Sequence, residues 1–147
     1  MALINELQAQ MKTAMKAKDK ETLSVVRMLK AAVLNKQISL GHDLTEDDEK
    51  SVLATELKQR KDSLAEFKAA GRDDLVAQLE GEIKVVESYL PAQLDEAAVA
   101  SLVDSVIQET GATGKADFGK VMKTLMPKVK GQADGALVNR IVKAKLS

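Results

Sequence analysis

The chain has 147 residues, of which 45% are hydrophobic and 30% are charged, with 22 basic against 22 acidic side chains. This length fits one domain or two small ones, and this composition is globular rather than disordered. There is no cysteine, which excludes disulfides, zinc–thiolate sites, iron–sulfur clusters and cysteine nucleophiles. No apolar stretch approaches the roughly 20 residues that span a bilayer, and the N-terminus lacks the apolar core of a secretory signal. We therefore expect a cytoplasmic protein without a membrane partner.

Apolar residues at helical spacing predict four helices in the first 90 residues. The first helix carries Ile4, Leu7, Met11, Ala14 and Met15 on one stripe. The second spans Thr22–Gln37. Thr45 has the pattern of an N-cap, with Asp48 three residues later, and opens a third helix that should stop at Gly71. Asp73 should then cap a fourth helix, antiparallel to the third because the turn between them is short.

Pro91 cannot continue the fourth helix, and it indicates a boundary between two subdomains, residues 1–90 and 91–147. Three aspartates are expected to cap the helices that follow: Asp95, Asp117 and Asp134. The middle one of these helices should end at Pro127. No segment shows the sustained alternation of a strand. The prediction is an all-α, multihelical protein, with an N-terminal bundle of about four helices and a smaller C-terminal tail subdomain of about three.

Charge is divided unevenly along this neutral chain. From Gly111 to Ser147 there are eight basic and two acidic residues, a net charge of +6, and the rest of the chain carries −6. Such a split favours a polyanion as partner for the C-terminal end, while a solubilised helical tail is the alternative. The candidate RNA-binding residues are Lys120, Lys123, Lys128, Lys130, Arg140 and Lys143. Of these, Lys128 and Lys130 are expected in a short link between Pro127 and Gly131.

The residue types of common active sites are largely missing. The only histidine, His42, follows Gly41 in a polar loop, where a solvated side chain is expected. The segment 114–120 has the spacing of a phosphate-binding loop, but Val121 replaces the Ser or Thr that would hold Mg²⁺, and no strand precedes it. The acidic residues at 43–49 lack the ligand spacing of a calcium loop. We predict no catalytic residue, no cofactor and no metal.

The C-terminal motif Leu125-Met126-Pro127-Lys128-Val129-Lys130-Gly131, with Ala133-Asp134-Gly135 after it, resembles the GatB/YqeY family. Its motif residues are Gly119, Pro127, Gly131, Asp134 and Gly135. The resemblance extends upstream through Gln59-Arg60-Lys61, Glu82-Ile83 and Gln93-Leu94. The order of these segments is that of the stand-alone, bacterial-type YqeY proteins.

The resemblance implies a helical N-terminal subdomain followed by a helical tail. The same module ends the B subunit of the glutamine-dependent tRNA amidotransferase, a carbon–nitrogen ligase, where it grips tRNA. Because the catalytic part of that subunit is missing here, we expect a non-catalytic accessory protein that docks on tRNA or another folded RNA through phosphate contacts. The alternatives are a protein-interaction module, and an accessory component of carbon–nitrogen ligation with glutamine as amido donor. Gln132 and Ala136 replace basic residues that are common in the family.

Overall fold

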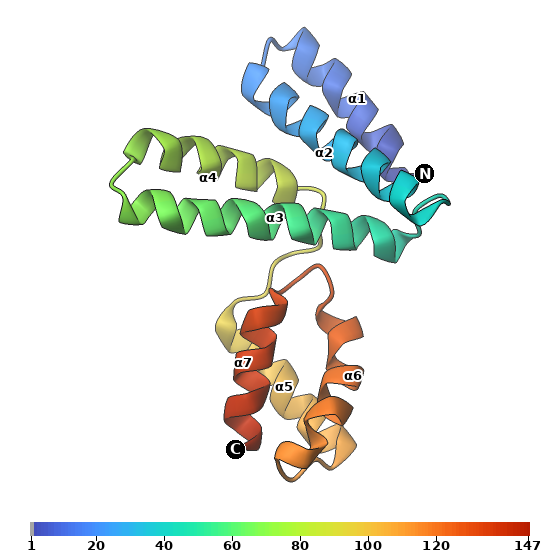
Figure 1. Ribbon diagram of the computed structural model, residues 1–147, viewed down its shortest axis with the longest axis vertical. Helices are drawn as coiled ribbons and strands as arrows, with labels where there is room; N and C mark the ends of the chain where they lie inside the picture. Colours follow the sequence, from blue (N-terminus) through green and yellow to red (C-terminus); the bar gives the residue numbers. More distant parts are fainter. Residues whose placement is uncertain (1) are drawn as a thin grey trace. The chain divides into compact units, whose positions relative to one another are not determined.

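The computed structural model describes residues 2–147, and over these residues it is all-helical, which confirms the predicted fold class (Figure 1). The chain divides into two compact units, one ending at Leu90 and the other spanning Pro91–Ser147. We call them the N-terminal unit and the C-terminal unit. Each has its own hydrophobic core. Among the helices of residues 2–147, none is both long enough and apolar enough to cross a membrane.

The N-terminal unit is built from two helical hairpins (Figure 1). Its helices are α1 (Ala2–Lys16), α2 (Lys20–Leu40), α3 (Glu46–Ala69) and α4 (Asp73–Glu87). The inner faces of both hairpins supply the core, with Leu7 and Leu29 from the first hairpin and Leu53, Leu57 and Val86 from the second. The opposite face of the α1–α2 hairpin is therefore left to the solvent.

Side-chain hydrogen bonds cap two helices of this unit, α2 and α3. Thr45 and Asp48 form the predicted capping box, in which the Asp48 amide donates to Thr45 Oγ1 (3.1 Å) and the Thr45 amide donates to Asp48 Oδ2 (3.0 Å). Asp19 caps α2 by accepting from the Thr22 amide (3.1 Å), so this helix begins before the predicted start. Asp73 was wrongly predicted as a cap: it is the first residue of α4, where a carboxylate favours the positive end of the helix dipole.

The C-terminal unit contains three α-helices and one turn of 3₁₀ helix. These are α5 (Glu96–Thr110), η1 (Lys115–Asp117), α6 (Phe118–Val129) and α7 (Gly135–Leu146). Fully buried valines and leucines fill the space between them, including Val103, Val121 and Leu125. Asp95 caps α5 through the Ala98 amide (2.7 Å), and Asp134 caps α7 through the Ala136 amide (3.2 Å), both as predicted.

Two predictions about α6 are wrong. Pro127 does not end the helix, which continues to Val129, because the Val129 side chain is only 1% exposed and completes the core. As a result Lys128 belongs to the last turn of α6 rather than to a link. Asp117 stands before α6 without capping it, since its carboxylate accepts from the Thr113 amide instead (3.0 Å).

Candidate functional site

The outer face of α6 presents lysines to the solvent. Lys120 and Lys123 are exposed and lie one turn apart, opposite the buried Val121 and Leu125. Neither lysine makes an ion pair among residues 2–147. Lys130, the residue after the helix, is also exposed. The face therefore holds two neighbouring cations, Lys120 and Lys123, that no carboxylate of the described residues pairs with.

Two of the other candidate cations, Lys128 and Arg140, are engaged by acids of α5. Lys128 Nζ lies 2.9 Å from Glu109 Oε2, and Arg140 Nη2 lies 3.3 Å from Glu96 Oε1. The two acids are 13 residues apart in one helix, hence about 20 Å apart, so Lys128 and Arg140 do not join one cluster. Each pair is exposed to solvent, where such a pair is worth roughly 0–1 kcal/mol and can exchange for another anion.

The C-terminal unit as a whole carries less net positive charge than its last 37 residues do. Pro91–Ser147 contains eight basic and six acidic residues, a net charge of +2, whereas Gly111–Ser147 carries +6. The difference lies in the four acids Asp95, Glu96, Asp104 and Glu109, of which Asp104 pairs with Lys145 (2.9 Å). The α5 acids thus offset the field of the basic residues along one side of the unit.

Lys143 belongs to α7, and its side chain reaches Phe118 at the start of α6. Its Nζ is 5.9 Å from the centre of the Phe118 ring, a cation–π distance. Lys115, Phe118 and Lys143 line a hollow of about 620 Å³ together with the last residues of α7. Because Phe118 is half-buried and Lys143 covers its ring, this aromatic side chain is not free to stack on a base.

The family motif after α6 holds the turn in place. Gly131 is buried with a φ of 76°, a left-handed conformation that favours glycine. Its carbonyl accepts from Gln93 Nε2 (2.7 Å), and Gln132 Nε2 donates to the Ala92 carbonyl (3.2 Å). The Leu94 amide donates in turn to the Gln132 carbonyl (2.8 Å). Gln132, which the sequence presented as a lost charge, is a link between the turn and the segment before α5.

The remaining motif glycines have no such constraint. A Cβ atom added to Gly119 or to Gly135 would meet nothing within 4 Å. Neither glycine is therefore required by packing in this unit. Pro127 is exposed on α6, so it adds no core contact of its own.

A buried ion cluster in the N-terminal unit was missed by the sequence reasoning. Arg60 is only 5% exposed; its Nη1 lies 2.7 Å from Glu56 Oε2, and its Nε lies 3.4 Å from Glu82 Oε1. The Nε atom has no hydrogen-bond partner, since the contact with Glu82 is an ion pair without hydrogen-bond geometry. Arg60 and Glu82 both belong to segments that carry the family resemblance, which was the available signal.

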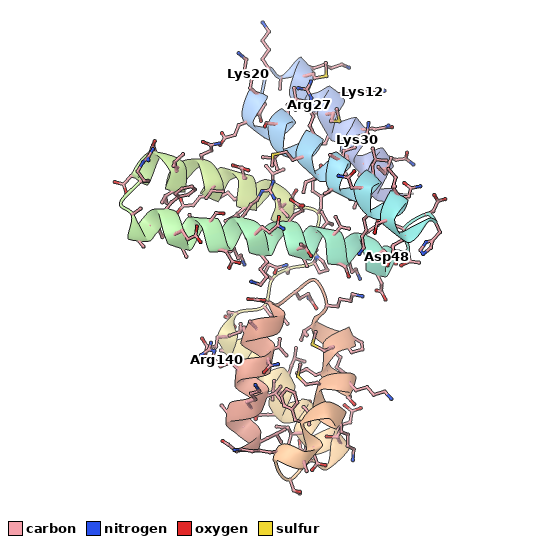
Figure 2. All side chains as sticks on the ribbon, viewed as in Figure 1. Lys12, Lys20, Arg27, Lys30, Asp48 and Arg140 are labelled. Carbon is pink, nitrogen blue, oxygen red and sulfur yellow. The ribbon has the colours of Figure 1, made fainter. Side chains whose placement is uncertain are left out.

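A second basic surface, also missed, covers the α1–α2 hairpin. Figure 2 shows Lys12, Lys20, Arg27 and Lys30 on these two helices. None of the four makes an ion pair within the described residues. The charge count of residues 111–147 against the rest of the chain did not reveal this surface, because the acids of α3 and α4 outnumber its cations.

Among the residues that the structure describes, neither unit assembles a recognisable catalytic group. His42 is exposed, and its Nδ1 lies 2.7 Å from the Asp43 carbonyl oxygen. Within residues 2–147 no group of three or more His, Cys, Asp or Glu side chains could hold a metal ion. Burial raises the pKa of Glu49, and burial together with the charge of Glu6 raises that of Tyr89. These two groups belong to the packing of the N-terminal unit.

Comparison with known proteins assigns the family. The family model described as "Yqey-like protein" matches residues 4–146. The chain belongs to the Yqey-like family. The predicted resemblance to GatB/YqeY proteins is thereby confirmed, and the relation to the GatB C-terminal module is consistent with it.

Curated relatives of this Yqey-like protein carry the name "Altered inheritance of mitochondria protein 41, mitochondrial". One from Kluyveromyces lactis is 36% identical over 86% of this chain and 74% of its own length. One from Saccharomyces cerevisiae is 36% identical over 70% of this chain, and the match spans about half (54%) of that relative. One from Pyrenophora tritici-repentis is 29% identical over 89% of this chain and 73% of its own length.

These names correct one prediction. The chain was expected to be cytoplasmic, but the relatives are named as mitochondrial proteins, and this finding overturns the cytoplasmic prediction. The cytoplasmic prediction rested on missing features, namely the absence of a signal core and of cysteine. Such absences do not distinguish one compartment without a secretory signal from another.

Proposed function

We propose that this Yqey-like protein is a non-catalytic accessory module that docks on folded RNA, with tRNA as the preferred class, through phosphate contacts of its C-terminal unit. The observation that carries the proposal is the pair Lys120 and Lys123, exposed on one face of α6 and free of ion pairs among the described residues. The family resemblance to the tRNA-gripping tail of the amidotransferase supports the choice of tRNA.

The geometry favours contacts to phosphates over contacts to bases. Lysine is a point charge on a flexible stem, which suits phosphate oxygens and reads no sequence. The exposed pairs Lys128–Glu109 and Arg140–Glu96 are weak enough to open when a phosphate competes for the cation. Phe118, the one aromatic residue of the C-terminal unit, is half-buried with Lys143 over its ring, so this unit is poorly suited to stack on an unpaired base.

A titration of folded tRNA at several salt concentrations tests this function. Each phosphate contact contributes about −0.9 to the slope of log K against log[salt], so Lys120→Gln/Lys123→Gln should make the slope shallower by about 1.8 and weaken binding at low salt. Glutamine keeps the helix propensity of lysine, so the fold is preserved.

Lys61→Gln/Lys68→Gln on α3 is the matched control, because it removes the same charge from exposed positions of the other unit. If the α6 variant binds tRNA with the parent's affinity and slope, the proposed docking face is wrong. If the parent does not bind tRNA at low salt, the function itself is wrong.

A further inference from the structure

Exposed apolar side chains are concentrated on the α1–α2 hairpin. Of the six large hydrophobic side chains that are exposed in residues 2–147, five lie there: Met15, Met28, Leu34, Ile38 and Leu40. Ile38 is 78% exposed and Leu34 is 40% exposed. The spacing of seven and four residues places Arg27, Leu34 and Ile38 on one face of α2, opposite its buried side chains. α2 is thus apolar on its inner face and partly apolar on its outer face.

The same hairpin is basic. Residues 2–40 contain seven basic and three acidic side chains. The acids are engaged away from the outer face: Asp19 caps α2, while Glu6 and Glu21 line hollows where α1 and α2 meet α4. Lys12, Arg27 and Lys30 therefore meet no opposing charge within the described part of the chain (Figure 2).

Only some partners suit a face of this composition. RNA phosphates would pair with the cations, but the apolar side chains of Leu34 and Ile38 would then face the hydrated, charged phosphate backbone. The hollow that α2 and α3 enclose, lined by Ala32 and Val52 among others, could receive side chains of a partner protein, but Leu34 and Ile38 do not line it. An anionic lipid surface accepts both groups, because basic side chains meet the headgroups and apolar ones enter the boundary with the acyl chains.

We propose that the outer face of the α1–α2 hairpin binds peripherally to anionic lipid surfaces. Leu34 and Ile38 enter the headgroup–acyl boundary, and Lys12, Arg27 and Lys30 contact the lipid phosphates. The binding requires no membrane-spanning helix. This surface belongs to the N-terminal unit, whereas the α6 face that we propose for RNA belongs to the C-terminal unit.

Co-sedimentation of the full chain with vesicles tests the proposal. The parent should bind vesicles of phosphatidylcholine with phosphatidylglycerol, and bind much more weakly to vesicles of phosphatidylcholine alone. Each basic residue near an anionic surface contributes about fivefold to the partition coefficient, so Arg27→Gln/Lys30→Gln should lower it about 25-fold. Leu34→Gln/Ile38→Gln should lower it about tenfold or more, because the buried apolar area is lost.

Two controls isolate the face. Lys61→Gln/Lys68→Gln removes equal charge from α3, and Met126→Gln removes an exposed apolar side chain from the C-terminal unit; neither should change vesicle binding. Apart from Lys30, which is half-buried, these sites are exposed, and unchanged helical content verifies folding. Absence of binding to anionic vesicles at low salt overturns the proposal. Vesicle binding by Leu34→Gln/Ile38→Gln equal to that of the parent also overturns it, because the apolar side chains would then play no part and the face would act by charge alone. In that case, a loss of tRNA binding by Arg27→Gln/Lys30→Gln would assign the face to RNA.

Discussion

Arg60 is buried although its charge spacing with Glu56 is typical of an exposed helix surface. Glu56 and Arg60 are four residues apart, a spacing typical of weak ion pairs on an exposed helix. In the folded unit the guanidinium is buried, and it joins Glu56 of its own helix to Glu82 of α4. Its Nη2 also lies 3.9 Å from Met28 Sδ on α2. One side chain thereby ties three helices together.

Removal of this arginine should strongly destabilise the N-terminal unit. Arg60→Leu leaves two largely buried carboxylates without their cation, and breaking such a buried pair costs about 3 kcal/mol or more in the free energy of unfolding. Urea unfolding followed by the fluorescence of Tyr89, the only tyrosine in a chain without tryptophan, reports on this unit alone.

The exposed pair Lys58–Asp62 on the same helix provides the comparison for that measurement. Asp62→Asn should change the free energy of unfolding by less than about 1 kcal/mol, because a solvated pair contributes little. An Arg60→Leu variant as stable as Asp62→Asn would show that the buried cluster is not a stabilising link.

The capping carboxylates should make the N-terminal unit sensitive to acid. Hydrogen bonds from the Thr22 side chain and amide lower the pKa of Asp19, and those from the Thr45 amide and side chain lower the pKa of Asp48, both from 3.8. Groups with a lowered pKa stabilise the folded state above their unfolded pKa, and this stabilisation disappears as the pH falls through the folded pKa.

The variant Asp19→Asn/Asp48→Asn should therefore lose less stability than the parent when the pH falls from neutral to below 3.8. Asparagine can still accept the capping hydrogen bond, which keeps the helix starts intact. Urea midpoints from Tyr89 fluorescence at the two pH values measure the difference. An identical loss in parent and variant would show that other carboxylates dominate the acid response.

At the scale of the helix, backbone conformation distinguishes two glycines of the C-terminal unit. Both have open space around them, but Gly111 follows α5 with a φ of 68°, whereas Gly119 lies within α6. Alanine at Gly111 should cost about 1–2 kcal/mol, because side chains disfavour the left-handed region. Alanine at Gly119 should instead stabilise the unit by about 0.4–1 kcal/mol, since it restricts the unfolded chain.

Thermal unfolding followed by circular dichroism measures both changes, and the Tyr89 signal of the other unit is the internal reference. Opposite shifts of the midpoint are the expected result. A destabilised Gly119→Ala variant would indicate a role for that glycine that the space around it does not explain. A loss of tRNA binding in a stable Gly119→Ala variant would place the RNA backbone close to this turn of α6.

At the scale of the whole molecule, two separate cores predict two folding units. The fragment of residues 2–90 and the fragment Pro91–Ser147 each retain a full hydrophobic cluster. Each fragment alone should be helical and should melt cooperatively. The C-terminal fragment should melt at the lower temperature, because a unit of about 60 residues buries a smaller fraction of its surface. Circular dichroism of the two fragments checks this, and a fragment without helical signal would show that the units depend on each other.

Helix content, most caps and family membership followed from the sequence alone. These features rest on interactions within a few residues: apolar periodicity for each helix, a side chain and an amide three residues apart for the caps of α3 and α5, and a contiguous motif for the family. The prediction that α6 ends at Pro127 was wrong. The burial of Val129, two residues later, outweighed the tendency of proline to end a helix.

Only the tertiary structure decided which charges are available to a partner. The pairing of Lys128 with Glu109 and of Arg60 with Glu82 joins residues about 20 apart in the chain, and helix packing alone brings them together. The same packing turns the acids of α5 toward the basic tail and leaves the basic, apolar face of α2 in solvent. A linear count of charge cannot reveal this, because neutralisation depends on distance in space and not on position in the sequence.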